Sequence, residues 1–458
     1  MLINKVTSKF GDHSSLLPLF TKDVVNSAGM TAFSYDAGGK IEAKDRFIDE
    51  FGTQAIWMGG LPGFKWAFDK TIYTLAKINP NIDARLLKDK EQLAIAQQYA
   101  KTLENKNIAN DLAKAVKNSK LTTNLFIGKF ATATALTLAS FFTLVKVKQN
   151  YTKKQIEKEF WAKKSEEHFY NNNVAKSPAF KAFTTDSNLT SQKGSNVSFK
   201  GLGSTLTNFM IDPVKNLFLV DAGITGERLL ASRTKTEFAE TTIKEGSLLF
   251  FLYVAGKYVQ TGIEKISDKF FKKPIDLHAE VLDSKYLKES IKTGKINEDI
   301  QAVKNLMSDK TKLYQYIYDS KNADNTVIKA AKHSGVIKTI VKGNWWEKLT
   351  GKATNTHLID PQKYINLSEI DDTANYLKKL ADKAPKSEEA LNKFLKGCRN
   401  MKIGSVAANM GLTCLFLGLI VPYSMMKYRE KHQNGNKEFH VQSEIERQLE
   451  QSFKGRMA

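Results

Sequence analysis

Cysteine is nearly absent from this chain, which has only Cys398 and Cys414 among its 458 residues. Both fall on one expected helix, where they would lie roughly 24 Å apart at about 1.5 Å per residue, too far for a disulfide bond. The sequence therefore excludes a fold held by disulfide bonds. Two cysteines are also too few for a Cys-rich zinc site.

The signatures of common enzyme classes are missing as well. The chain has no Gly-Lys-Ser/Thr phosphate loop and no Gly-x-Ser-x-Gly nucleophile elbow. No two histidines stand at the i, i+4 spacing that puts both rings on one helical face for a metal ion. We therefore predict no catalytic residue, no metal site and no cofactor, and the patterns favour a protein that is not an enzyme.

Acidic residues are scarce beside basic ones, with 48 Asp and Glu against 69 Lys and Arg, so the formal charge is +21. Such an excess indicates an anionic partner, which is a lipid surface, a nucleic acid or an acidic protein. The lysines are scattered, and many stand beside apolar segments, as is typical near membranes. The favoured partner is an anionic lipid bilayer, nucleic acid is less favoured, and no small-molecule ligand is indicated.

Charge is missing altogether from residues 404–426. As a helix this segment covers about 34 Å, enough to cross a bilayer. Residues 121–145 contain one charge, Lys129, whose long side chain reaches toward the membrane interface. The sequence predicts transmembrane helices at 121–145 and 404–426, and hence a multi-pass membrane protein.

The rest of the chain divides by composition. Residues 271–403 carry apolar pairs at i, i+4, so we expect a soluble helical domain there. The expected fold is thus all-α, a multi-helix membrane protein with a soluble helical domain between two transmembrane helices. The remaining segments are a polar leader (1–52), an interfacial or re-entrant segment with an amphipathic helix (53–120), a polar linker (146–200), membrane-proximal helices (201–270) with a third candidate span at 246–263, and a polar tail (427–458).

A charged stripe is the first candidate functional feature. Arg233, Glu237, Glu240 and Lys244 stand at i, i+4, i+7 and i+11, on one face if 225–263 is a single helix. The common interpretation of such a stripe is a solvated surface. The alternative is a polar network that docks against membrane-embedded helices, in which Arg233 finds an acidic partner on another helix.

Two further groups concern the apolar segments. Lys65 and Asp69 form an i, i+4 pair within an apolar block, so they are candidates for an ionisable pair at membrane depth, with a surface helix as the alternative. Gly404, Ala408 and Gly411 lie on one face of the second span. Small residues allow another helix to approach closely, which points to a protein partner through the transmembrane helices.

Three functions fit these patterns. The first is a membrane protein with a structural or interaction role at an anionic membrane surface. The second is a transporter or channel component, with the blocks at 53–79, 203–220 and 246–263 inserted as broken helices. The third is a basic nucleic-acid-binding protein with buried apolar helices. Two spans predict that both termini lie on the same side of the membrane, and a third span would separate them.

Overall fold

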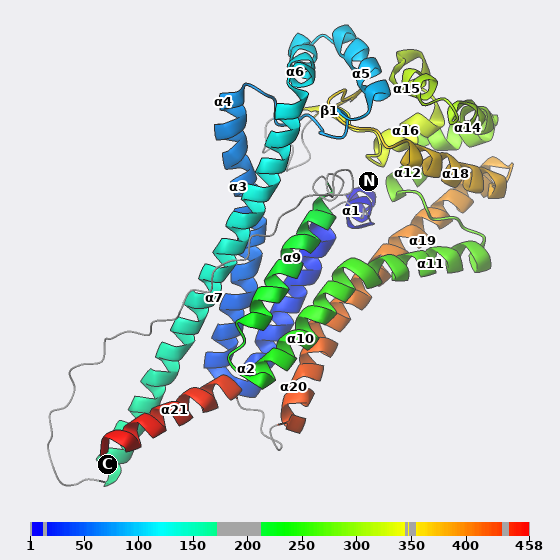
Figure 1. Ribbon diagram of the computed structural model, residues 1–458. Coiled ribbons are helices and arrows are strands. Elements are labelled where there is room, and N and C mark those ends of the chain that lie inside the picture. The colour runs from blue at the N-terminus through cyan, green and yellow to red at the C-terminus, as the bar shows by residue number, and fades with distance from the viewer. Residues whose placement is uncertain are drawn as a thin grey trace.

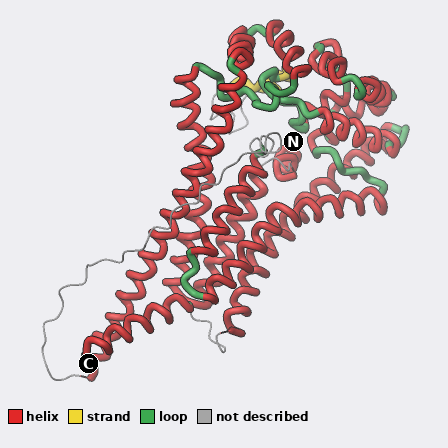
Figure 2. Tube along the Cα trace, viewed as in Figure 1, coloured by secondary structure: helices red, strands yellow, loops and turns green. Residues whose placement is uncertain are grey.

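The computed structural model describes residues 2–11, 16–171, 212–343, 347, 354–432 and 439–457. Helices make up nearly all of its regular structure, so the all-α expectation is confirmed. The described strands are β1 (Thr339–Lys342) and β2 (Thr354–Ile359), which pair antiparallel. Long helices form an elongated bundle with a globular domain at one end, which we call the head domain (Figures 1 and 2).

The bundle contains two helices that each extend far along its axis. One is α7 (Ser119–Asn171), and the other runs without interruption through α19 (Glu388–Leu415), η5 (Phe416–Ile420) and α20 (Val421–His432), where η5 is a turn of π-helix. The other bundle elements are α2 (Leu16–Ala55), η1 (Ile56–Gly60), α3 (Leu61–Phe68), η2 (Asp69–Tyr73), α4 (Thr74–Ala76), α9 (Pro213–Leu230), α10 (Lys235–Leu249), η3 (Phe250–Ala255), α11 (Gly256–Phe271) and α21 (His440–Met457).

The first 52 residues do not form the expected loose leader. They fold into α1 (Leu2–Gly11) and most of α2, which reverses direction at Gly39 with φ 71° and so makes a two-legged hairpin inside the bundle. This positive φ is open to glycine at little cost. Polar composition suggested a leader because α2 buries many polar residues beside apolar ones such as Met30 within the bundle, among them Asn26, Ser27 and Glu42.

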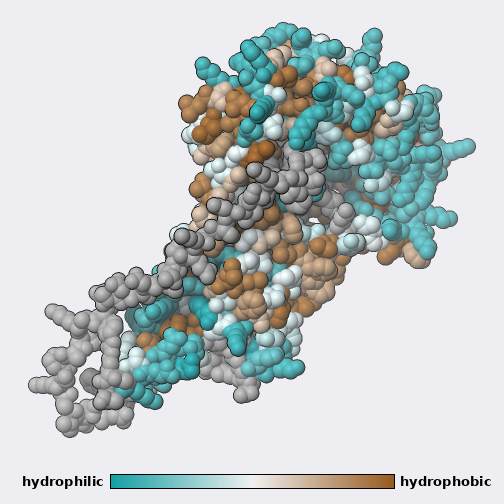
Figure 3. Space-filling model, viewed as in Figure 1, coloured by the Kyte–Doolittle hydropathy of each residue, from teal (hydrophilic) through white to brown (hydrophobic). Residues whose placement is uncertain are grey.

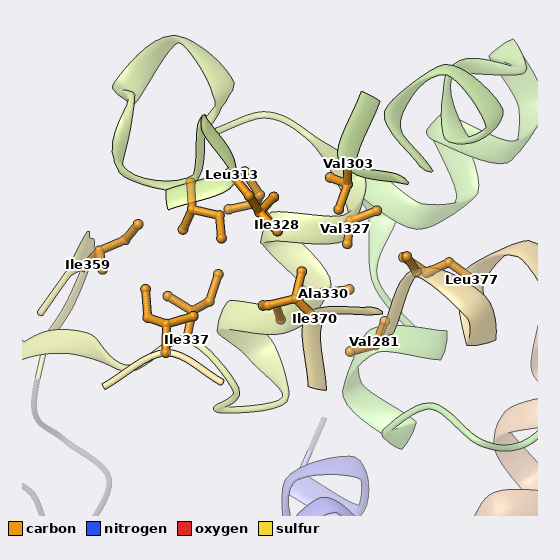
Figure 4. Packing of buried hydrophobic residues seen from close by; sticks show 14 of the residues in the cluster. Val281, Val303, Leu313, Val327, Ile328, Ala330, Ile337, Ile359, Ile370 and Leu377 are labelled. Atoms are coloured by element: carbon orange, nitrogen blue, oxygen red, sulfur yellow. The ribbon is translucent and has the colours of Figure 1, made fainter. Parts of the chain in front are cut away.

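The head domain comprises the described residues of the ranges 77–117 and 272–403. Its helices surround a dry aliphatic centre, and Figure 4 shows Leu313, Val327 and Ile370 pointing into it. Ser387 caps α19 by accepting from the Ala390 amide, and from there one helix leads from the head into the bundle. The head helices are α5 (Lys90–Thr102), α6 (Lys106–Lys117), α12 (Ala279–Leu282), α13 (Lys285–Thr293), α14 (Lys295–Leu306), α15 (Lys310–Tyr318), η4 (Ser320–Asn322), α16 (Thr326–His333) and α18 (Leu367–Lys383).

Two of the described helices are long and apolar enough to cross a membrane, Ser119–Ser165 and Glu388–His432. They contain the predicted spans 121–145 and 404–426. Only 28% and 33% of the residues in their most apolar stretches are buried within the protein, whereas the core helix of a soluble protein is mostly buried. Length and composition do not single out the third candidate, 246–263, in the part of the chain that the structure describes.

The other segments named from the sequence can be located in the structure. The predicted linker at 146–200 begins instead as the second half of α7, and its residues from 172 on, with 201–211 of the next segment, lie outside the described residues. The tail at 427–458 includes the end of α20 and the helix α21, which packs against α7. The chain begins beside the head domain and ends at the opposite end of the bundle, which we call the far end (Figure 1).

Candidate functional site: a buried charge network

The second leg of α2 carries a polar face. Glu42, Arg46, Asp49, Glu50 and Thr53 stand at i, i+4, i+7, i+8 and i+11, so they share one side of the helix. All five are buried. Charged residues are almost never fully buried unless they are paired, so this face requires charged partners on the neighbouring helices.

α10 supplies a matching face. Glu237, Glu240, Lys244 and Glu245 are buried on it, and Lys244 is only 1% exposed. Helix α10 packs against α9 and α20, and α2 packs against α7 and α20. The two polar faces therefore meet inside the far end of the bundle, with α7, α9 and α20 around them.

Arg429 of α20 joins the two faces. Its guanidinium donates to Glu42 Oε1 from Nη2 at 2.7 Å and to Glu240 Oε1 from Nε at 2.7 Å. All three side chains are completely buried. Arg46 Nη2 approaches Glu240 Oε2 at 3.4 Å and supplies a second positive charge. Two guanidinium groups thus compensate two carboxylates in a site without water access, and removal of one partner would leave an uncompensated charge.

A second cluster lies beside the first. Arg228 of α9 approaches Asp49 at 3.3 Å and donates to Thr53 Oγ1 at 2.7 Å. It also contacts Glu245, which accepts from Lys244 at 2.8 Å. The structure thus brings together a network of seven carboxylates and six cations from five helices and one turn, which we call the charge network: Glu42, Asp45, Asp49, Glu50, Glu237, Glu240, Glu245, Arg46, Lys148, Arg228, Arg233, Lys244 and Arg429.

The predicted stripe is not one helical face. The helix breaks between α9 and α10, because Thr234 caps α10 by accepting from the Glu237 amide, and Arg233 therefore lies in the turn. From there its guanidinium binds Glu237 at 2.7 Å and reaches Asp45 of α2 at 3.3 Å. Burial opposes ionisation of Glu237, but the bound Arg233 prevails and lowers the pKa of this carboxyl to about 2.

Each stripe residue enters the charge network by a different contact. Arg233 has the off-helix acidic partner that the docking hypothesis requires, and Glu240 and Lys244 contact Arg429 and Glu50. The second leg of α2 was missed, although its spacing from Glu42 to Thr53 is readable in the sequence. A segment interpreted as a leader gave no reason to look for a partner face.

The other two groups predicted from sequence are arranged differently. Asp69 pairs with Lys129 of α7 at 2.7 Å, rather than with Lys65. Among the described residues, a β-carbon added at Gly404 or Gly411 would meet nothing within 4 Å, so this face is open. Close helix packing occurs instead between Gly29 and Gly418, where a β-carbon on Gly29 would lie 2.1 Å from the Gly418 carbonyl oxygen.

Polar groups continue from the charge network toward the head domain. Asp23 accepts from Trp57 Nε1 at 3.3 Å. Beside it, the Lys22 side chain is 4% exposed, and no carboxylate of the described residues lies within ion-pair distance of it. A β-carbon on Gly256 would lie 3.2 Å from Lys22 Nζ and 3.7 Å from Asn409 Oδ1, so glycine makes room for the ammonium group.

Known proteins give no further assignment. No family model, no curated protein and no solved structure matches this chain. Within the described ranges, no group of three or more His, Cys, Asp or Glu side chains is arranged to hold a metal ion. The chemistry of the site is therefore argued from its own charges. These charges bind five helices together inside the far end of the bundle.

Proposed function

We propose that this chain is a multi-pass integral membrane protein that holds its head domain at an anionic membrane surface, in a structural or interaction role. The observation that carries the proposal is the reversed polarity of the bundle. Its interior contains the charge network, whereas large apolar side chains lie exposed on its outer faces, as lipid favours and water does not. Examples are Leu136 and Phe142 of α7, Leu412 and Leu415 of α19, and Phe250 of η3.

The distribution of hydropathy supports the same interpretation. On the face shown in Figure 3, hydrophobic residues gather over the bundle, while the outer head domain and the far end are mostly hydrophilic. The 404–426 segment spans about 34 Å as helix, close to the thickness of a hydrocarbon core. Charge therefore lies at both ends of an apolar belt, the pattern of a protein that crosses a bilayer.

The charge network gives this protein rigidity rather than an open path. Each guanidinium or ammonium group in it has a carboxylate partner, and these pairs tie α2, α7, α9, α10 and α20 together at one level. Hydrophobic association between helices is weak in lipid, so polar contacts take over part of that role. A bundle fixed at its far end would hold the continuous α19, and with it the head domain, at a constant orientation.

A single residue tests membrane insertion. Leu415 lies at the centre of 404–426 and is 47% exposed, and arginine at the centre of a spanning helix costs about 2.5–3.5 kcal/mol. We expect the wild type to resist carbonate extraction. Leu415→Arg should lower the fraction of the protein that stays in the membrane pellet after carbonate treatment. The control is Leu358→Arg on the head domain, which is equally exposed at 47% and should have no effect. Wild-type protein in the carbonate supernatant would overturn the proposal.

Topology provides a second test. The head domain and the C-terminal helix lie at opposite ends of the bundle (Figure 1), so an odd number of crossings should separate them. With Cys398 and Cys414 replaced, single cysteines introduced at Thr311 in the head domain and at Ser452 in α21 should be labelled from opposite sides of a sealed membrane. Labelling of both from one side would contradict a bundle that crosses the bilayer along its length.

Transport of a small ion is the second candidate function, and Lys22 is the observation that favours it. A buried ammonium group without a carboxylate partner among the described residues, beside Asn409 and Asp23, is expensive at membrane depth and marks functional positions. In proteoliposomes containing a pH-sensitive dye, proton flux above that of empty liposomes, lost in Lys22→Met, would favour transport. The control Lys9→Met changes an exposed lysine of α1. Flux equal to that of empty liposomes would reject the candidate for protons.

A further inference from the structure

A cavity of about 230 Å³ lies where the bundle meets the head domain. α3 and α7 form its bundle side, and the loop after α4 together with the segment between β2 and α18 forms its head side. This volume is below the range typical of drug-sized ligands and is suited to one compact polar group. The charge network occupies the far end of the bundle, so the cavity is a separate site.

Positive charge dominates the cavity wall. Lys65, Lys129 and Lys363 line it against one carboxylate, Asp83, which Arg85 already binds at 2.9 Å. Lys363 Nζ donates to the Asn81 carbonyl at 2.6 Å, which aims this side chain across the head side of the cavity.

The two lysines on the bundle side differ in their partners. Lys129 is shared between Asp69 and the ring of Tyr73, whose centroid lies 5.5 Å from Nζ. No carboxylate of the described residues lies within ion-pair distance of Lys65. Three ammonium groups thus converge from three separate segments of the chain on a space that holds too little negative charge to balance them.

Apolar groups complete the site on the membrane side. Phe126 and Phe130 of α7 line the cavity within the apolar 121–145 segment. Next to it the outer surface is apolar and aromatic, because Trp66 is 64% exposed and Leu75 is 79% exposed. Tryptophan in such a position is typical of the membrane–water interface. The cavity therefore combines three ammonium groups with two aromatic side chains beside an apolar outer surface, as a site for a lipid headgroup requires.

We infer that this cavity binds the phosphate of an anionic phospholipid, with Lys65, Lys129 and Lys363 as donors and the acyl chains passing over Phe126 and Phe130. Ammonium groups bind phosphate oxygens through charge-assisted hydrogen bonds. Free phosphate shares this chemistry, but it has no apolar part that would contact the two phenylalanines of the 121–145 segment. These side chains therefore favour a lipid over free phosphate. The inference rests on the proposed membrane location and gives the anionic surface a specific binding site.

Native mass spectrometry and fluorescence titration of the full-length, detergent-solubilised protein test the inference. The probes are short-chain phosphatidic acid, phosphatidylcholine with the same chains, and inorganic phosphate. We expect phosphatidic acid to bind at least about tenfold more tightly than either other probe. In Lys65→Gln/Lys363→Gln its Kd should rise at least about tenfold, since each lost contact to a charged group is worth more than one factor of ten. The matched control Lys70→Gln/Lys77→Gln removes two lysines outside the cavity wall and should change the Kd less than twofold.

The outcomes separate this inference from the proposed function. If the control variant raises the Kd for phosphatidic acid as much as the cavity variant does, the lipid binds to the net positive charge of the protein and the site is rejected. If inorganic phosphate binds as tightly as phosphatidic acid, the lipid assignment is overturned, whatever the carbonate extraction shows. If the protein resists carbonate but no probe is sensitive to the cavity lysines, the cavity inference fails while the membrane proposal stands. Lys129→Gln is omitted because it would also strand Asp69.

Discussion

The head domain and the far end of the bundle bury opposite kinds of residue, although the bundle also contains a buried apolar cluster around Met30, Phe141 and Leu417. The head closes over aliphatic side chains such as Val327 and Ile370, both fully buried, whereas the far end of the bundle closes over Arg429, Glu42 and Glu240, also fully buried. Large apolar side chains are exposed mainly on the bundle among the described residues. The surrounding solvent decides which side chains a protein buries, so the proposed membrane location accounts for this difference by water around the head and lipid around the bundle.

The largest expected effect in this comparison is Arg429→Ala. The change strands the Glu42 and Glu240 carboxylates without their main partner, and we expect a loss of about 3–5 kcal/mol in stability, as for other broken buried ion pairs. The control is Arg399→Ala, whose pair with Asp283 is 24% and 38% exposed and should contribute under about 1 kcal/mol. Thermal aggregation of the detergent-solubilised proteins measures both.

Replacement of the whole cluster sharpens the test. Glu42→Gln, Glu240→Gln, Arg46→Met and Arg429→Met together remove the two carboxylates and the two guanidinium groups and leave side chains of similar size, and buried ion pairs often tolerate such a replacement. We expect the quadruple variant to recover most of the stability lost in Arg429→Ala. An Arg429→Ala protein that melts like the Arg399→Ala control would show that water reaches the cluster and that the bundle does not have a dry polar interior.

The next effect concerns the head domain. Leu313 is fully buried in its core, so Leu313→Ala should cost about 2–5 kcal/mol through lost burial and a residual cavity. Leu412→Ala on the bundle shortens a side chain that is 45% exposed and should cost less than about 0.5 kcal/mol. Urea-dependent labelling of Cys398, which is fully buried, reports head unfolding once Cys414 is replaced. Equal losses from the two substitutions would contradict the assignment of Leu313 to a packed core and of Leu412 to an outer surface.

Sequence predicted the head domain better than the bundle. The i, i+4 spacing of apolar residues over 271–403 predicts helices, and the described residues of this range are mostly helical. In the bundle the same logic fails, because the second leg of α2 buries Arg46 and Asp49, which composition assigns to a surface. The pairing of Arg429 with Glu42, almost four hundred positions away in the chain, depends on tertiary packing that no local spacing encodes.

The turn between α9 and α10 offers a smaller effect. Arg233→Ala removes a guanidinium that is 18% exposed and binds Asp45 and Glu237. Asp45 keeps its hydrogen bond from Thr152 at 2.6 Å, so we expect a loss of about 2 kcal/mol, between the values for exposed and fully buried pairs. The control is Lys235→Ala two residues later, an exposed position. A melting temperature that equals the control's would place Arg233 in solvent and remove it from the charge network.

The smallest effect is a pH dependence that belongs to the head domain alone. Burial, with the neighbouring charges of His357 and Lys329, lowers the pKa of His333 below its usual value of about 6.5. The unfolded chain therefore takes up a proton on His333 at a higher pH than the folded head does. The stability of the folded head is therefore unaffected by His333 above pH 6.5. It declines as the pH falls from the pKa of His333 in the unfolded chain to its lower pKa in the folded head. His333 is partly exposed, so the decline should be slight.

Urea titrations followed through Cys398 at a series of pH values measure this decline, and His333→Gln should flatten the plot of head stability against pH. If thermal aggregation of the protein showed the same pH dependence and lost it in His333→Gln, the head and the bundle would unfold as one unit. The difference between their interiors would then not make one region less stable than the other.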